Sequence, residues 1–212
     1  MKNLILHYGS NSAVEVLSYI VDTSEDINKK KIYIYDDNTS YIKYKELKDI
    51  CNGIIVVEKF NDLKKIKNSV SLITVGDTKL RDTKYKLLKK NNFELFTYIH
   101  PTSTLSKCSK VSKGCIIGPY VFIGTKSVLK PNSIINSYAL CGHHTKIGQS
   151  CNLSPRVNIL GESKIGQRVL IGTGSVILQN IKICSDTKVS ANSVVNQSIN
   201  FKCLVHGNPA KK

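Results

Sequence analysis

Two adjacent histidines are the residues of this sequence best suited to acid–base chemistry. The chain contains five His, and only His143 and His144 lie within the middle of a long six-residue repeat. They take the third and fourth places of the hexad at 141–146, close to a turn, where side chains point outward. An unperturbed imidazole titrates at about 6.5 and can accept a proton at neutral pH, which predicts a general base. The alternative interpretation is a surface or subunit-interface histidine.

The elements that must position these histidines are the turns of an internal repeat. Every sixth residue from Leu105 to Phe201 is apolar, and a small or apolar residue follows four positions later. Six residues suit a short strand and a sharp turn, and three such units close a triangular coil of about 18 residues. The repeat therefore predicts a parallel β-helix of roughly five stacked coils. Its register is unbroken from residue 105 to residue 201, so no large internal loop is expected. The alternative, a chance run in a Val/Ile-rich sheet protein, would not keep this register. Glycine follows the ladder residue at Gly118, Gly124, Gly148, Gly166 and Gly172.

The seven cysteines do not read as a disulfide framework or a zinc site, since their number is odd and no CxxC pair occurs. Cys115, Cys141 and Cys151 fall on inward positions of the repeat, which predicts small buried side chains in a reducing compartment. No apolar run approaches the length of a membrane span and no signal peptide opens the sequence. We therefore expect a cytoplasmic protein that does not insert into a membrane.

Positive charge is concentrated in the repeat. Residues 1–100 carry 17 Lys/Arg against 13 Asp/Glu, whereas residues 101–212 carry 14 Lys/Arg against only Glu162 and Asp186. A basic surface attracts polyanions, but no interleaving of basic and aromatic residues predicts nucleic-acid binding. Two interpretations stay open, namely phosphate-bearing small molecules and a simple compositional bias toward lysine.

The first hundred residues have the alternation of a small Rossmann-like α/β domain. An apolar run at 2–8 leads into Gly9, Ser10 and Asn11 and then a helical pattern, so the helix N-terminus there is a candidate phosphate site. A second strand at 31–35 ends in Asp36 and Asp37, carboxylates suited to a ribose or base. The full GxGxxG pattern is absent, and an ordinary turn and a solvated loop are the alternatives.

Further segments complete this prediction. Strands are expected at 53–57, 71–75 and 94–98, with helices at 61–68 and 79–91, the second capped by Asp77 or Thr78. Pro101 marks the boundary, because the residue before a proline favours extended backbone. The predicted domains are residues 1–100, which bind a nucleotide sugar, and residues 101–212, which bind acetyl-CoA and carry the catalytic residues.

This arrangement resembles the hexapeptide-repeat acyltransferases, in particular bacterial nucleotide-sugar acetyltransferases with a small α/β domain before the β-helix. Members of that branch N-acetylate 4-amino-4,6-dideoxy sugars for surface glycans such as O-antigen, and close relatives O-acetylate sialic acid. The ending Gly207-Asn208-Pro209-Ala210-Lys211 is similar to the G-x-P-A-K tail of many such enzymes. The resemblance implies a left-handed β-helix, a homotrimer with sites between neighbouring β-helices, and acetyl-CoA as co-substrate without a metal.

The resemblance also implies roles for particular residues. His143 precedes Ile147-Gly148 as the general base of that branch does, and Gly161 matches the glycine whose N–H holds the thioester oxygen. Two positions depart from the pattern, because His144 replaces an acid and Asn152 replaces a second histidine. We expect His144 or Asn152 to orient His143, with His144 as a substitute base. Coenzyme A is expected along a set of four residues: Gly161, Gly172, Ser175 and Lys211.

Several functions remain open at this point. The first is transfer of acetyl to the C-4 amine of a dTDP-, UDP- or GDP-linked 4-amino-4,6-dideoxy sugar. The second is O-acetylation of sialic acid or another sugar. The others are a metal-dependent hydratase of the carbonic anhydrase kind, for which three metal-binding histidines are not available, and a non-catalytic trimeric sugar-nucleotide-binding protein.

Overall fold

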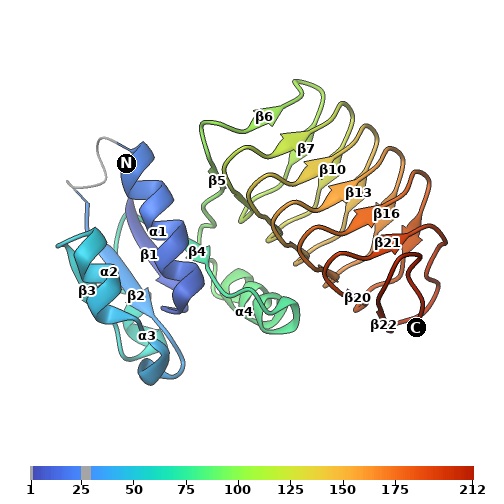
Figure 1. Cartoon of the computed structure of the whole chain (residues 1–212). Helices are drawn as coiled ribbons and strands as arrows, with labels where there is room; N and C mark the ends of the chain where they lie inside the picture. Colours follow the sequence, from blue (N-terminus) through green and yellow to red (C-terminus); the bar gives the residue numbers. More distant parts are fainter. Residues whose placement is uncertain (1, 25–29) are drawn as a thin grey trace. The chain divides into compact units, whose positions relative to one another are not determined.

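The computed structural model describes residues 2–24 and 30–212, which form two compact units. The first unit is Met1–Gly76 with Thr83–Phe96, and the second is Asp77–Asp82 with Thr97–Lys212. Figure 1 shows an α/β unit with sheet and helices, and a stack of coils that runs from green to red toward the C-terminus.

The first unit has a parallel sheet of the order β3-β2-β1-β4. Its strands follow the apolar runs of the sequence: β1 (Asn3–His7), β2 (Ile32–Tyr35), β3 (Ile54–Val56) and β4 (Ser69–Ile73). Leu6 pairs with Ile34 on one side and with Leu72 on the other. The strand order reverses between β1 and β4, and ligands of open α/β sheets bind beside the carboxyl ends of strands at such a point.

The helices of this unit are α1 (Asn11–Thr23), α2 (Tyr44–Ile50), α3 (Phe60–Leu63) and the part of α4 (Thr78–Lys90) from Thr83 onward, with a 3₁₀ turn at Thr39–Tyr41. The first turn of α4 belongs to the second unit. Helix α1 buries Ala13, Val16, Leu17 and Ile20, a spacing that keeps them on one face. The carboxylate of Asp77 accepts hydrogen bonds from the amides of Lys79 and Leu80, so the predicted cap of α4 is confirmed. Helix α2 was not predicted from the sequence, and at seven residues it is too short to show a helical period.

The second unit is a parallel β-helix whose two-residue strands form three sheets, here called faces I, II and III. Face I consists of β7 (Lys110–Val111), β10 (Val128–Leu129), β13 (Lys146–Ile147), β16 (Lys164–Ile165) and β19 (Lys182–Ile183). Face II consists of β5 (Tyr98–Ile99), β8 (Ile116–Ile117), β11 (Ile134–Ile135), β14 (Asn152–Leu153), β17 (Leu170–Ile171), β20 (Lys188–Val189) and β22 (Leu204–Val205). Face III consists of β6 (Thr104–Leu105), β9 (Phe122–Ile123), β12 (Leu140–Cys141), β15 (Asn158–Ile159), β18 (Val176–Ile177) and β21 (Val194–Val195).

The register of these sheets confirms the predicted coil. Ile147 pairs with Leu129 in the preceding coil and with Ile165 in the next, an offset that repeats along each face. The ladder residues fill a continuous buried column, to which Cys115, Cys141 and Cys151 contribute as free thiols. Burial raises the pKa of the Cys141 thiol to about 12. These cysteines are therefore packing residues, as predicted.

Three further details differ from the sequence-based expectation. The helix expected at 61–68 is a short turn in the structure, where α3 ends at Leu63. Phe201 is 48% exposed and lies beyond the regular column, so the inward ladder ends before it. The expected strand at 94–98 is divided, because Leu95 bridges to Ser71 in the first unit whereas Tyr98 pairs with Ile116 in the β-helix. Both segments are apolar and extended, and the sequence pattern does not reveal which sheet each one joins.

Candidate active site

His143 and His144 lie at the corner of the β-helix between β12 and β13, and both side chains are exposed. Their Nδ1 atoms are 3.1 Å apart, and their rings meet edge to face with centroids 5.3 Å apart. One Nδ1 must carry the hydrogen and the other must accept it. The backbone of His144 has a φ of 58°, the left-handed conformation found at most corners of this β-helix. The contact therefore restrains the orientation of the His143 ring, and His143 Nε2 is the basic nitrogen when His143 Nδ1 carries the shared hydrogen.

Gly161 lies one coil further along the same corner, directly beside the His143 ring. A β-carbon placed on Gly161 would lie 2.4 Å from His143 Nε2, a distance that no real contact allows. The two coils are also joined by the amide of Glu162, which donates to the His143 carbonyl at 2.8 Å. The absence of a side chain at Gly161 is thus what lets the imidazole lie against the backbone of the next coil.

The peptide of Gly161 has a donor that the fold does not use. Its carbonyl accepts a hydrogen bond from the amide of Asn180 at 3.0 Å. No acceptor for the Gly161 N–H occurs among the residues that the structure describes. A backbone N–H beside an imidazole is the arrangement that stabilises an oxyanion while a base handles the proton.

Asn152 does not belong to this corner within one chain. It lies in β14 on face II, and its side-chain oxygen accepts a hydrogen bond from Asn136 at 3.0 Å. Within one chain, the side-chain partner of His143 is therefore His144, and the expectation that Asn152 orients His143 is not met there. The sequence spacing placed Asn152 in the next strand, but the triangular coil turns that strand onto another face.

The residues expected to bind coenzyme A are dispersed. Ser175 is fully buried, and its hydroxyl donates to the Ser190 carbonyl at 2.8 Å, so its side chain is a corner residue of the core and does not face a ligand. Gly172 lies at the corner between faces II and III, whereas Gly161 lies at the corner between faces III and I. Lys211 is exposed near the C-terminus, where its backbone pairs with His206.

In the first unit, Asp36 braces the turn after β1. It is 5% exposed, and its two oxygens accept hydrogen bonds from the amides of Gly9 at 3.2 Å and Asn38 at 3.1 Å. These bonds tie the end of β2 to the turn that leads into α1, with Ser10 at the N-cap and Asn11 as its first residue. Asp36 is therefore better explained as a structural brace than as the ribose ligand expected from the sequence.

Asp37 is half-exposed and is held by Lys84, a residue that the sequence analysis did not identify. The ammonium group of Lys84 lies 2.9 and 2.8 Å from the two oxygens of Asp37, and only 3% of its side chain is exposed. Three rings surround that ammonium at 5.0–5.8 Å from their centroids: Tyr8, Tyr35 and Phe60. Burial opposes ionisation of Asp37, but the bonds from Lys84 and Tyr35 outweigh it and lower its pKa. A helical lysine 47 positions away from its acid leaves no local signal in the sequence.

His7 lies beneath this cluster at the end of β1. It is fully buried, and its Nε2 is 3.1 Å from the hydroxyl of Ser71. Burial, and secondly the charge of Lys84, lower the pKa of His7 to about 3, so the ring stays neutral. This histidine is part of the core and not a second catalytic base.

The described part of the chain offers no candidate metal site. Within residues 2–24 and 30–212, no group of three or more His, Cys, Asp or Glu side chains is arranged to hold an ion. The described helices are likewise too short or too polar to cross a lipid bilayer.

Comparison with known proteins shows which families and folds this chain resembles. The family described as bacterial transferase hexapeptide (six repeats) matches residues 162–197. An acyl-[acyl-carrier-protein]–UDP-N-acetylglucosamine O-acyltransferase from Chlamydia caviae is 35% identical over 63 residues, which are 30% of this chain and 23% of that protein. Residues 162–197 of the β-helix are thus similar to the hexapeptide repeat of bacterial transferases, and this chain covers about a quarter of the length of that relative.

Solved structures match over the full length. A mutant of perosamine N-acetyltransferase from Caulobacter crescentus, in complex with CoA and GDP-perosamine, has a TM-score of 0.85 at 22% identity and covers 100% of this chain and 96% of its own. WeeI from Acinetobacter baumannii AYE has a TM-score of 0.87 at 20% identity, covering 100% and 99%. The acetyltransferase domain of PglB from Neisseria gonorrhoeae FA1090, in complex with acetyl coenzyme A, has a TM-score of 0.83 at 23% identity, covering 99% and 98%.

These likenesses define the fold. The chain has the architecture of these acetyltransferases, a small α/β unit followed by a left-handed parallel β-helix of hexapeptide repeats. The fold class predicted from the sequence is confirmed.

Proposed function

We propose that this protein is an acetyl-CoA-dependent N-acetyltransferase that acts on the C-4 amine of a nucleotide-linked 4-amino-4,6-dideoxy sugar destined for a surface glycan. The observation that carries the proposal is the corner at which His143 is held by His144 while its Nε2 faces Gly161. A structural neighbour that contains both CoA and GDP-perosamine supports a nucleotide amino sugar as the acceptor.

The reaction needs a positioned amine, one proton acceptor and one oxyanion donor. The sugar amine attacks the thioester carbonyl, and the carbonyl oxygen becomes an oxyanion that the Gly161 N–H stabilises. His143 removes a proton from the attacking nitrogen, the C–S bond breaks, and the proton passes to the departing thiolate of coenzyme A. General base catalysis of this kind contributes about 10²–10⁴-fold, and holding both substrates in place supplies much of the rest.

His144 takes the position at which related enzymes have an acid. We assign the shared hydrogen to His143 Nδ1 and the accepting role to His144 Nδ1. In this tautomer His144 serves the same purpose as a carboxylate, since it holds the His143 ring and leaves Nε2 as the basic nitrogen. His144 is therefore a positioning residue in this proposal. An amine is a better nucleophile than a hydroxyl and depends less on a strongly activated base, which favours N-transfer.

The acceptor's nucleotide is assigned to the first unit. The N-terminus of α1 at Ser10 and Asn11 offers backbone amides to a diphosphate, beside the point where the strand order reverses. Asp37 is the carboxylate of this edge that retains exposed surface, at 55% of its side chain. We assign it to the ribose or the base.

The assembly is assigned as a homotrimer in the cytoplasm. Four of the six outward residues of face III are apolar: Phe122, which is 44% exposed, Leu140, Val176 and Val194. Packing these residues together between copies removes apolar surface from water. A neighbouring copy would also bring its Gly172 corner and its Asn152 toward the groove of the first, which accounts for their dispersal within one chain.

The test is a panel of acceptors with acetyl-CoA, read by thiol release. The panel contains dTDP-, UDP- and GDP-linked 4-amino-4,6-dideoxy sugars, their 4-hydroxy counterparts, and free sialic acid. We expect turnover of at least one amino sugar and loss of about 10²-fold or more in His143→Asn. Turnover of sialic acid alone would replace the proposal by O-acetylation, and coenzyme A binding without turnover would indicate a binding protein.

A further inference from the structure

Lys84 is a buried cation at the edge of the sheet to which the acceptor's nucleotide is assigned. Only 3% of its side chain is exposed, and its ammonium group lies 2.9 and 2.8 Å from the two oxygens of Asp37. A lysine is almost never buried to this extent unless it is paired. Among the described residues, Asp37 is the one acid within ion-pair distance of Lys84. Both residues belong to the first unit, so their contact is formed without the β-helix.

Three aromatic rings enclose this ammonium group. The ring centroids of Tyr8, Tyr35 and Phe60 lie 5.1, 5.0 and 5.8 Å from Lys84 Nζ. An aromatic face attracts a cation, and the attraction is strongest where water is excluded. The rings therefore hold the ammonium group in place and direct its hydrogen bonds to the one polar partner that it has, Asp37.

Two of these aromatic residues also direct their hydroxyl groups at Asp37. Tyr35 donates to Oδ1 at 2.8 Å, and the hydroxyl of Tyr8 lies 3.5 Å from Oδ2. Burial, and secondly the bond to Asp37, raise the pKa of Tyr35 to about 12, so its hydroxyl keeps its proton and remains a donor. The backbone of Tyr8 has a φ of 77° directly before the Gly9 turn. The carboxylate is thus held from α4 and from the end of β2.

These contacts leave Asp37 with one place for a further donor. A carboxylate accepts hydrogen bonds at about four positions, two on each oxygen. Lys84 occupies one position on each oxygen, and Tyr35 occupies the second on Oδ1. The hydroxyl of Tyr8 is too far from Oδ2 for a strong bond, so Oδ2 keeps an acceptor position. Since 55% of the Asp37 side chain is exposed, that position is accessible to a ligand.

Lys84 also balances the charge at this edge. Asp36 accepts a hydrogen bond from the amide of Gly9, just before the N-terminus of α1 to which the diphosphate is assigned. Two adjacent carboxylates would repel a diphosphate there, and the positive charge of Lys84 offsets one of them. Because Lys84 is covered, its ammonium group does not itself contact a ligand. It acts through Asp37, by fixing where that carboxylate lies and by neutralising it.

We propose that Lys84 is a positioning residue that makes this site select a ribonucleotide over a 2′-deoxyribonucleotide. Held by Lys84 and Tyr35, Asp37 presents a single acceptor position at a fixed place, which suits one hydroxyl donor. In open α/β sheets a carboxylate at the end of the second strand is placed for the ribose 2′-hydroxyl. The acceptor is then a sugar linked to GDP or UDP and not to dTDP. This inference rests on the proposed function, because it takes the acceptor to be nucleotide-linked.

Binding is measured directly by titration calorimetry, with no acetyl transfer involved. The ligands are GDP, dGDP, UDP and dUDP, because the members of each pair differ only in the 2′-hydroxyl. The test variant is Lys84→Met, which keeps an unbranched chain among the rings and removes the charge. Lys84→Gln is a second neutral variant, and circular dichroism shows that each variant is folded. The matched control is Lys89→Met, which removes an exposed lysine from the last turn of α4 and changes the net charge equally.

We expect the parent protein to bind each ribonucleotide about tenfold or more tightly than its deoxy counterpart, because one hydrogen bond to a charged acceptor is lost in the latter. In both Lys84 variants this ratio should fall below about threefold, whereas Lys89→Met should keep it.

Three results would overturn the role given to Lys84. The first is a parent protein without a preference for ribose, and the second is a ratio that the Lys84 variants leave unchanged while both affinities fall equally, as a purely structural lysine would cause. The third is discrimination between the two bases with none between ribose and deoxyribose, which would assign Asp37 to the base. A parent protein that binds none of the four nucleotides would reject the nucleotide-linked acceptor, and with it this inference, so the two failures are distinguished.

Discussion

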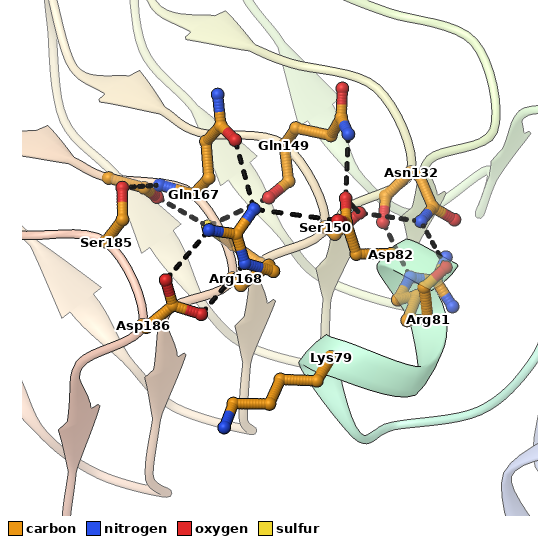
Figure 2. Close-up of polar contacts among 12 residues, drawn as sticks. Lys79, Arg81, Asp82, Asn132, Gln149, Ser150, Gln167, Arg168, Ser185 and Asp186 are labelled. Carbon is orange, nitrogen blue, oxygen red and sulfur yellow. Dashed lines mark hydrogen bonds and ion pairs between the residues drawn. The ribbon is translucent and has the colours of Figure 1, made fainter. Parts of the chain in front are cut away.

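Arg81 and Asn132 bind each other reciprocally across 51 residues of sequence. The guanidinium Nε of Arg81 donates to the Asn132 carbonyl at 2.6 Å, and the Asn132 side chain donates to the Arg81 carbonyl at 3.1 Å (Figure 2). Both residues are fully buried within the second unit. Burial lowers the pKa of Arg81 to about 9, which leaves it charged at neutral pH. The pair fastens the first turn of α4 to a corner of the β-helix.

Substitution of Arg81 by Met should therefore destabilise the protein. The change removes charge-assisted hydrogen bonds and leaves the Asn132 carbonyl without its donor, so we expect a loss of about 2–4 kcal/mol in the free energy of unfolding. Urea denaturation followed by circular dichroism measures it. Arg156→Met, at an exposed corner, serves as the control and should stay within about 1 kcal/mol. If Arg81→Met and the parent protein had equal free energies of unfolding, the buried contacts of Arg81 would contribute nothing to stability.

Gly161→Ala should abolish most of the proposed activity without unfolding the protein. The new β-carbon would meet His143 Nε2, and the imidazole is an exposed side chain that can rotate away. We expect kcat to fall by about 10²-fold as the base leaves its position, with a thermal unfolding midpoint within a few degrees of the parent. Gly53→Ala is the control, because its β-carbon would only approach a backbone oxygen at 3.6 Å. An alanine variant with parental kcat would contradict the role given to this contact.

His144→Phe tests the positioning role of the second histidine. Phenylalanine keeps a planar ring but removes the nitrogen that bonds His143 Nδ1. We expect kcat to fall by about tenfold or more, with little change in KM for acetyl-CoA and a displaced pH profile, since the tautomer of His143 is no longer fixed. His144→Glu restores an acceptor for Nδ1–H and should recover activity. A merely structural histidine would leave the pH profile unchanged and would not be rescued in this way.

His7 should make folding sensitive to mild acid. The unfolded imidazole titrates at about 6.5, whereas the buried ring stays neutral to about 3, so the unfolded state binds more protons between these values. The contribution of His7 to stability is therefore fully present above pH 6.5. Between pH 6.5 and about 3, the free energy of unfolding falls by about 1.4 kcal/mol for each unit by which the pH decreases. Urea titrations at pH 7.5, 6 and 5 measure the slope. In His7→Gln that contribution should vanish, and an unchanged slope would show that His7 is not its source.

The aromatic cluster around Lys84 illustrates where the sequence carried too little information. Asp36 and Asp37 are adjacent acids at the end of one strand, and the sequence pattern treats them alike. The structure separates them, because Asp36 turns inward to the amides of Gly9 and Asn38 while Asp37 meets Lys84 from a distant helix. Which carboxylate braces a turn and which meets a ligand depends on contacts that no local spacing records.

The β-helix was determined by the sequence alone. A six-residue period of apolar residues leaves one way to bury them all, in which each coil pairs with the coil before it, and the observed register follows that period from β6 to β21. The closeness of His143 and Gly161 follows from the same period, since residues one coil apart at one corner become neighbours.

Tertiary structure alone decided what the period does not encode. The period puts Ser175 on an inward position, like Cys115 and Cys151, but only the structure shows that its hydroxyl is taken by the Ser190 carbonyl. Likewise, only the structure shows that the side-chain oxygen of Asn152 is bonded by Asn136. The sequence offered His144 as one of two candidate orienters of His143, and the side-chain geometry shows that His144 is its partner within one chain. The reciprocal bonds of Arg81 and Asn132 left no signal in the sequence. These relationships join residues through space by side-chain direction, which a linear pattern fixes only where the core demands it.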